Sequence, residues 1–193
     1  MVTDFYAKDK LTAAEAKFEA QKIAFAPFMF QAAKALRDFG ILEAVEKNKE
    51  AGITVFELSE ILNLPRYGVK VLAEAGLGMG LLLLNNEKYL LAKTGYFILH
   101  DPMTRVNMDF VQDVNYQGFF CLQEAVKSGK PEGLKVFGNW PTIYQALAEL
   151  PEKAQKSWLA FDHFYSDAAF KEAMPLVFKN KPVHLHSCER RIG

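Results

Sequence analysis

The sequence predicts a mainly α-helical protein that begins with a winged helix-turn-helix. Two observations predict this fold class. Helix-forming segments at residues 11–37, 41–47, 55–62 and 66–75 follow one another with short polar breaks between them. Over residues 77–99 the helical spacing of apolar residues then gives way to two short apolar runs around a polar turn, which is typical of a β-hairpin wing.

The first segment is the most apolar of the expected helices. Residues 11–37 are rich in Ala and straight-chain side chains, and Pro27 is expected to divide or kink the helix because proline removes a helical N–H. Its apolar residues are Phe18, Ile23, Phe25, Phe28, Phe30, Ala33, Leu36 and, just beyond it, Phe39. These residues give the helix more apolar surface than a single buried face requires. The segment is either a core helix or one that buries a second face against another subunit, and its clustered aromatics favour the second interpretation.

The next three helices carry signals for their ends. A turn at Phe39 and Gly40 precedes a short helix from residue 41 to residue 47, and Thr54 stands three residues before Glu57, the spacing of a capping box. Gly76 and Gly78 are expected to end the helix at 66–75 as C-cap glycines. The positions expected to face inward are Val55, Leu58, Ile61 and Leu62, then Val69, Leu72 and Ala73.

After Asp101 and Pro102 the chain is expected to become helical again. Residues 104–128 predict one long helix or a pair, followed by an irregular segment rich in Gly and Pro. A helix that begins at Pro151 is expected to run through Tyr165, and residues 170–178 are expected to form one more.

The charge pattern argues against a nucleic-acid reader. The 23 basic and 23 acidic side chains cancel, and no block of the chain is strongly basic. In a DNA-binding winged helix, the helix that corresponds to residues 66–75 enters the major groove. Here that helix carries two basic residues, Arg66 and Lys70, together with Tyr67 and the acidic Glu74. Because DNA binding requires several phosphate contacts at once, this winged helix is predicted to serve packing and dimerisation.

Composition sets the class of protein. Half of the residues are hydrophobic and 24% are charged, so the chain can bury a core. Two cysteines are too few for a disulfide framework, which favours a reducing compartment, and Cys121 is expected to be a buried thiol. The N-terminus has no apolar stretch of signal-peptide type, and no apolar run approaches the ~20 residues that cross a bilayer. We therefore expect a cytoplasmic protein with no membrane partner.

Several runs resemble one known family in their order and spacing. They are FGILEA at 39–44, TVFEL at 54–58, LPRYGVKVL at 64–72, the segment 115–131, Phe137-Gly138, and FDHFYSD at 161–167. Together they are similar to the S-adenosylmethionine-dependent small-molecule O-methyltransferases of the plant caffeate and bacterial hydroxyindole type. The resemblance covers about residues 15–183.

This resemblance implies a winged-helix dimerisation domain, followed by helices that lead into a Rossmann-like methyltransferase domain. Members of the family are dimers, so a homodimer is expected here through residues 11–50 and the winged helix. They transfer a methyl group from S-adenosylmethionine to a hydroxyl of a small molecule. The family places substrate-pocket residues in the helices of the second half, which implies a pocket at Phe119, Trp140, Phe161, Phe164 and Tyr165. Ordinary core packing explains the same five residues.

The sequence departs from the family after residue 185. In the family, the first Rossmann strand ends in a glycine-rich loop that lets the backbone approach the methyl donor, but residues 186–193 contain no such loop. The tail does hold His184, His186 and Cys188, yet structural zinc sites usually need four ligands, so no metal is expected. On this interpretation the chain divides into a winged-helix domain at 1–101, a helical segment at 102–183 that starts the methyltransferase domain, and an atypical truncated tail at 184–193.

The function expected from the sequence is therefore that of the N-terminal part of an O-methyltransferase, acting at most as a dimerisation and substrate-pocket module. Whether the chain is an enzyme stays open, because the donor site and a catalytic base are missing from it. The alternative is a stand-alone winged-helix dimerisation or transcription-regulator module. Salt-dependent retardation of DNA in a mobility-shift assay would favour the regulator.

Overall fold

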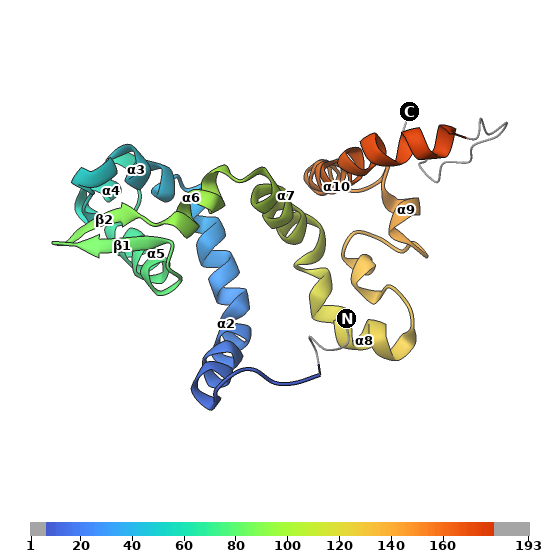
Figure 1. Cartoon of the computed structure of the whole chain (residues 1–193), viewed down its shortest axis with the longest axis horizontal. Coiled ribbons are helices and arrows are strands. Elements are labelled where there is room, and N and C mark those ends of the chain that lie inside the picture. The colour runs from blue at the N-terminus through green and yellow to red at the C-terminus, as the bar shows by residue number, and fades with distance from the viewer. Residues whose placement is uncertain (1–6, 180–193) are drawn as a thin grey trace. The chain divides into compact units, whose positions relative to one another are not determined.

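The computed structural model describes residues 7–179 and is shown in Figure 1. The chain forms two compact units, Met1–His100 and Asp101–Gly193, and each is described by itself. The fold is mainly helical with a two-stranded hairpin, which confirms the predicted fold class. Among the helices described, none combines the length and the apolar character needed to cross a membrane.

The first unit begins with the long helix α2, Ala13–Asp38. A capping box starts it: the Glu15 N–H donates to Thr12 Oγ1 at 3.3 Å, and the Thr12 N–H donates to Glu15 Oε2 at 2.8 Å. The helix continues through Pro27, so the expected division into two helices is wrong. One missing N–H is tolerated here because strong helix formers lie on both sides of the proline.

Four short helical elements follow α2. They are α3 (Ile41–Lys47), η1 (Lys49–Ala51), α4 (Val55–Leu62) and α5 (Arg66–Gly78). The predicted capping box of α4 is confirmed: the Glu57 N–H donates to Thr54 Oγ1 at 3.2 Å, and the Thr54 N–H donates to Glu57 Oε2 at 2.8 Å.

Helix α5 is longer than the sequence predicts. It runs through Gly76 and Gly78, and Gly80, with φ of 69°, takes the left-handed conformation after its end. Gly76 instead serves close packing, because a Cβ there would lie 3.0 Å from the Leu82 side chain and 3.2 Å from the Leu36 side chain. A glycine inside a helix was therefore mistaken for a glycine that ends one.

The wing is an antiparallel hairpin of β1 (Leu82–Asn85) and β2 (Lys88–Leu91). Asn86 and Glu87 form the turn with φ of 48° and 63°, as the two central residues of a type I′ turn require. Ile53 adds a bridge on the other side of β2, with hydrogen bonds in both directions between its backbone and that of Tyr89, at 3.1 and 2.8 Å.

Residues 93–99, expected to continue the second strand, form helix α6 (Lys93–His100). The strand ladder ends where the Ala92 N–H donates to the Leu81 carbonyl at 3.0 Å, and the Tyr96 N–H then donates to the Ala92 carbonyl, which starts the helix. The apolar residues of this segment are adjacent rather than alternating, so periodicity alone could not separate the two structures.

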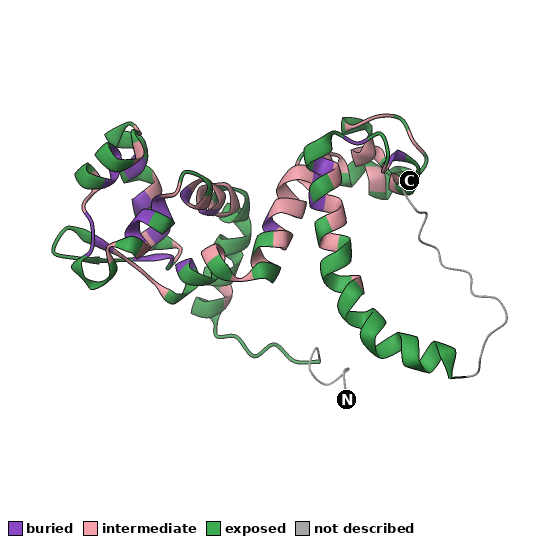
Figure 2. Ribbon diagram, turned by 90° about the horizontal axis from the view of Figure 1, so that it is seen from above, coloured by how far each residue is buried: buried purple, intermediate pink, exposed green. Residues whose placement is uncertain are grey.

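The core of the first unit collects aliphatic side chains from the end of α2, from α3, α4 and α5, from Ile53 and from the wing. Figure 2 shows the buried residues gathered in this region. The largest fully buried side chains are Leu36, Ile41, Leu42, Val45, Ile53, Leu58, Val69 and Leu82. The short helix α3 supplies three of them, so it forms the centre of the core.

The second unit is built around α7 (Pro102–Phe110) and the long helix α10 (Glu152–Phe178). Asp101 caps α7, since its carboxylate accepts from the Thr104 N–H at 2.8 Å and from the Thr104 hydroxyl at 2.6 Å. After Phe110 the helix widens into a π-helical turn, η2 (Val111–Asn115), in which the Tyr116 N–H donates to the Val111 carbonyl at 2.8 Å.

Between η2 and α10 lie four short elements: η3 (Gly118–Cys121), α8 (Leu122–Ser128), η4 (Glu132–Val136) and α9 (Ile143–Ala146). The stretch expected as one or two helices at 104–128 is thus broken. The backbones of Gly118 and Gly133 approach so closely that a Cβ on Gly118 would lie 3.1 Å from the Gly133 carbonyl oxygen. Cys121, expected to be buried, is only half-buried.

The separate helix expected at 170–178 is part of α10, which continues through Pro175. The core of this unit is small: Val114, Ala146, Leu150 and Ala154 are buried, and half-buried aromatic and aliphatic side chains surround them.

Candidate dimerisation surface and aromatic cluster

The N-terminal part of α2 displays large apolar side chains to solvent. Phe18 is 63% exposed, Ile23 76% and Phe28 73%, and Phe25 lies beside Phe28 with ring centroids 6.1 Å apart. Buried positions of this helix occur only towards its C-terminal end, at Ala33 and Leu36. Within the described chain, this apolar surface is left uncovered, a property of interaction sites rather than of ordinary protein surface.

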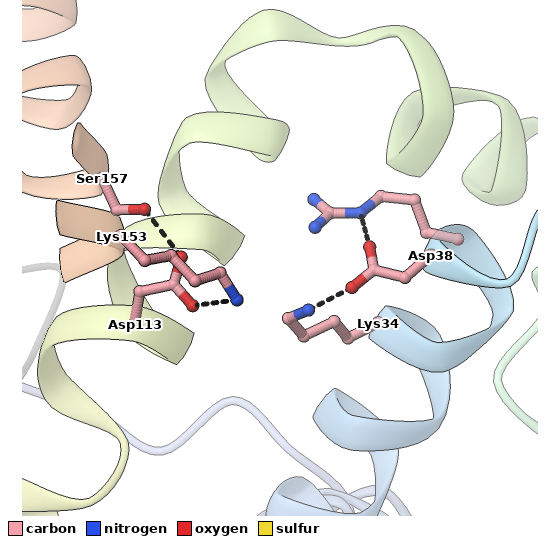
Figure 3. A network of polar contacts seen from close by, with 6 residues as sticks. Lys34, Asp38, Asp113, Lys153 and Ser157 are labelled. Carbon is pink, nitrogen blue, oxygen red and sulfur yellow. Dashed lines mark hydrogen bonds and ion pairs between the residues drawn. The ribbon is translucent and has the colours of Figure 1, made fainter. Parts of the chain in front are cut away.

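Polar contacts fix the C-terminal end of α2. Lys34 and Arg37 both bind the Asp38 carboxylate, Arg37 through Nε at 2.8 Å from Oδ1 (Figure 3). Burial alone would raise the pKa of Asp38, but the two basic side chains outweigh it and hold that pKa below its usual range. These contacts lie within α2, and the burial of Ala33 and Leu36 is what anchors this end in the unit, while the other end presents the apolar surface.

The exposed side of α4 and α5 is also partly apolar. Phe56, Ile61 and Tyr67 are all more than half exposed, so the expectation that Ile61 faces inward is wrong. The Arg66 guanidinium lies 5.9 Å from the centre of the Phe56 ring. Lys70, the other cation of this surface, is paired with Glu74 at 3.7 Å. The exposed side of α4 and α5 therefore has few basic side chains that could contact the phosphates of a nucleic acid.

Aromatic rings in the second unit pack between α7 and α10. Phe110 stacks on Phe161 with ring centroids 4.0 Å apart, and Trp158 meets the Phe110 ring at 5.5 Å. Tyr165 lies 4.9 Å from Phe161, and its hydroxyl donates to Asn107 Oδ1 at 2.9 Å. We call Phe110, Trp158, Phe161, Phe164 and Tyr165 the aromatic cluster, since Phe164 joins it through Tyr165 at 5.3 Å.

The five residues that the sequence singles out as a pocket are not all brought together. Phe161, Phe164 and Tyr165 belong to the aromatic cluster. Trp140 instead packs on the small buried core, and Phe119 lies on η3 with 57% of its surface exposed. Phe110 and Asn107, which the sequence reasoning missed, complete the cluster. Their helical spacing along α7 was the signal, but it acquires meaning only once α10 is known to lie against that face.

A polar network lies on the same pair of elements, further along. Asp113 on η2 accepts from the Ser157 hydroxyl at 2.7 Å and pairs with Lys153 Nζ at 2.9 Å (Figure 3). The contacts from Asn107–Tyr165 through Phe110–Phe161 to Asp113–Ser157 run in opposite directions along the two elements. The α7–η2 segment and α10 are therefore antiparallel.

No metal centre is visible in residues 7–179, where His, Cys, Asp and Glu side chains nowhere form a group of three that could hold an ion. His184, His186 and Cys188 lie outside the described residues, so the structure says nothing about them.

Comparisons with known proteins identify the first unit. Residues 17–89 match the model of the Dimerisation2-like domain family. No curated protein sequence matches the chain.

Solved structures with a similar fold include several methyltransferases. The S-adenosylmethionine-dependent methyltransferase SibL, in its apo form, aligns with a TM-score of 0.63 and 21% identity, over 81% of this chain and 45% of its own. The mitomycin 7-O-methyltransferase MmcR aligns with a TM-score of 0.63 and 16% identity, over 84% of this chain and 47% of its own. The dimethyltransferase RosA of Streptomyces davawensis, which acts on an amino-riboflavin, aligns with a TM-score of 0.57 and 17% identity, over 88% and 47%.

The chain thus spans less than half the length of each of these three structures. The matched domain model covers the winged helix together with most of α2, where the exposed apolar surface lies. Residues 17–89 match the Dimerisation2-like domain model, and the chain has the fold of the N-terminal part of S-adenosylmethionine-dependent O-methyltransferases.

Proposed function

We propose that this chain forms a homodimer through residues 11–50 and the winged helix. The observation that carries the proposal is the exposure of three large apolar side chains, Phe18, Ile23 and Phe28, on a helix that lies mostly within the residues matched by the Dimerisation2-like domain model. A second copy would bury these side chains, and apolar burial is the main favourable term in association. A two-fold dimer would cover the same apolar surface on both copies.

We propose further that the dimer serves a methyltransferase that uses S-adenosylmethionine. The similar solved structures include methyltransferases for very different acceptors. MmcR is named for an oxygen acceptor, whereas RosA is named for an amine. Because one fold hosts both, the acceptor atom follows from the site and not from the fold. A hydroxyl acceptor remains the expectation from the resemblance of the sequence.

The second unit supplies the acceptor pocket in this proposal. Phe161, Phe164 and Tyr165 offer ring surface for an aromatic acceptor, and Phe119 and Trp140 would have to complete the pocket from other elements. Phe110 and Phe161 stack at 4.0 Å, which leaves no space for a ligand between them. An acceptor would therefore lie against the exposed sides of Phe164 and Tyr165. Its position relative to the donor methyl would decide the rate of transfer.

Sedimentation equilibrium tests the dimer. We expect the chain to be a dimer at micromolar concentration and the double variant Ile23→Ser, Phe28→Ser to be a monomer with unchanged helical circular dichroism. The control is Leu176→Ser, which removes an apolar side chain of similar exposure, 72%, from α10 and leaves α2 intact. A monomeric wild-type chain, or a double variant that associates as well as the wild type, would overturn the proposal.

Titration calorimetry tests the donor. We expect no binding of S-adenosylmethionine to this chain, because the glycine-rich loop that approaches the donor in the family has no counterpart in residues 7–179. The sheet described there is the hairpin of the wing, with no parallel strand to present such a loop. Saturable micromolar binding of the donor would contradict this expectation.

A further inference from the structure

A small cavity lies beside the π-helical turn in the second unit. Its volume is about 210 Å³, and its lining includes Gln112, Asp113, Gln117, Phe137 and Lys153. If a water molecule occupies roughly 30 Å³, the cavity holds on the order of seven waters or one small organic molecule. π-Helical turns occur frequently at functional sites, because the extra residue redirects the side chains that follow.

The one carboxylate that lines this cavity is nearly buried. The side chain of Asp113 is 8% exposed. Ser157, itself buried, donates to Oδ2 at 2.7 Å and fixes the orientation of the carboxylate. A buried negative charge requires a positive partner, and here the positive charge comes from the Lys153 ammonium, 2.9 Å from Oδ1.

The two sides of this ion pair differ in their environment. The Lys153 side chain is 74% exposed, so its ammonium can move into water when another cation takes its place beside Asp113. The Asp113 carboxylate, in contrast, remains nearly buried whichever cation pairs with it. An ammonium group from another molecule can therefore replace that of Lys153 without leaving a buried charge unpaired.

We propose that this cavity binds a small organic ammonium ion, which takes the position of the Lys153 ammonium at Asp113 Oδ1. The side-chain carbonyl of Gln117 can accept a further N–H hydrogen bond. The Phe137 ring supplies an apolar face, which attracts cations through its quadrupole. An anionic ligand is disfavoured because it would meet the Asp113 carboxylate.

This site is separate from the aromatic cluster, whose five rings are not among the residues that line the cavity. The proposal therefore does not depend on methyl transfer or on the dimer. A failure of either earlier proposal leaves the prediction for this cavity unchanged.

Two matched probes test the inference by NMR titration of the full chain. Benzylammonium carries the positive charge, and benzyl alcohol has the same number of non-hydrogen atoms without it. We expect benzylammonium to shift the amide signals around Asp113 and Gln117 with a dissociation constant of roughly a millimolar, as suits so small a ligand. We expect benzyl alcohol to bind about tenfold more weakly or not at all, because it cannot pair with the carboxylate.

Three variants make the result specific. Asp113→Asn is expected to weaken binding of benzylammonium by about tenfold or more. Lys153→Met is expected to strengthen it, because the competing ammonium is gone. The control is Lys156→Met, which removes a lysine of the same helix that pairs with Glu152 at 2.6 Å and does not line the cavity, and it should leave binding unchanged.

The signs of these effects decide the outcome. Equal binding of the two probes, or a Lys153→Met chain that binds benzylammonium no better than the wild type, would refute the proposal. Lys153→Met leaves the nearly buried Asp113 carboxylate without its cation. The comparison of the two probes on the wild-type chain needs no variant, so it keeps the test decisive even if either variant fails to fold.

Discussion

The two long helices, α2 and α10, have the same plan in opposite directions. They contain 26 and 27 residues, and each has only two buried residues. In α2 the buried positions, Ala33 and Leu36, lie towards the C-terminal end, whereas in α10 the buried positions, Ala154 and Ser157, lie near the N-terminal end. Each helix is therefore packed at one end and exposed at the other (Figure 2).

The packed ends differ in how they are held. Leu36 of α2 enters a core of fully buried aliphatic side chains. The packed end of α10 is held by half-buried rings such as Phe161 and by the polar contacts of Asp113. Because apolar stabilisation scales with the area removed from water, α2 is expected to be anchored more firmly than α10.

The exposed ends differ in what is known about their partners. The apolar residues of α2 lie inside the matched dimerisation domain at 17–89, while Phe170, Met174, Val177 and Phe178 of α10 lie outside it. Both sets of side chains are exposed, those of α2 more so, yet a second copy is supported as the partner of α2 alone. An exposed apolar helix thus indicates that a partner exists, and a second observation is needed to say which.

The largest effect is expected at the packed end of α2. Leu36→Ala should lower the free energy of unfolding by about 2–5 kcal/mol, because the side chain is fully buried and its removal leaves a cavity. Ile23→Ala, at the exposed end, should cost little in the monomer but weaken the dimer, so its effect should depend on protein concentration. Urea denaturation at two concentrations measures both. A concentration-independent loss at Ile23 would break the comparison.

A smaller effect is expected at the packed end of α10. Phe161→Ala should cost about 1–3 kcal/mol, less than a fully buried Phe, since the ring is half-buried and its main gain is stacking on Phe110. Phe178→Ala, at the exposed end, should stay within about 0.5 kcal/mol. If Phe161→Ala proves as costly as Leu36→Ala, the two helices are anchored equally and the contrast drawn between them is wrong.

Local signals made the first unit predictable from the sequence. The capping box depends only on Thr54 and Glu57, three residues apart, and the hairpin turn depends on two adjacent residues. Both can therefore be predicted without knowledge of any tertiary contact. The errors lie where a distant contact decides. Gly76 looked like a helix end because its role depends on Leu36 and Leu82.

The second unit and its site were harder to predict. The break after residue 115 depends on the approach of Gly118 to Gly133, which no periodicity records. The aromatic cluster needs Phe110 from α7, a residue 51 positions before Phe161, and Asp113 was not singled out because Ser157 lies 44 residues away. The residue types were visible in the sequence, but their pairing was not.

The helix starts offer a finer test of the same comparison. Thr54→Ala should cost about 1 kcal/mol, because it leaves an N–H of α4 without its acceptor. In the monomeric Ile23→Ser, Phe28→Ser chain, Thr12→Ala removes the same kind of cap from the exposed end of α2 and should reduce helix content there without a comparable loss in global stability. Helix α10 starts at Pro151 with no side-chain cap, so it has no equivalent site. Circular dichroism and urea denaturation, measured together, separate the two effects.

The smallest effect is a difference in acid sensitivity between the two capped helices. Hydrogen bonds from the Thr54 backbone and hydroxyl lower the pKa of Glu57 below 4.5, and those from Thr12 do the same for Glu15. A carboxyl whose pKa is lower in the folded state stabilises that state above its unfolded pKa, and the gain is lost as the pH falls through the lowered value. Glu57→Gln should therefore destabilise the first unit at neutral pH and have no effect once the pH lies below the pKa of Glu57 in the folded chain. In the monomeric Ile23→Ser, Phe28→Ser chain, Glu15→Gln should show the same sign in the helix content of α2 and little change in the urea midpoint, because no second copy covers that end and the helix frays there. Equal shifts of the midpoint for the two variants in that chain would mean that the exposed end of α2 is as firmly held as α4 even without a dimer.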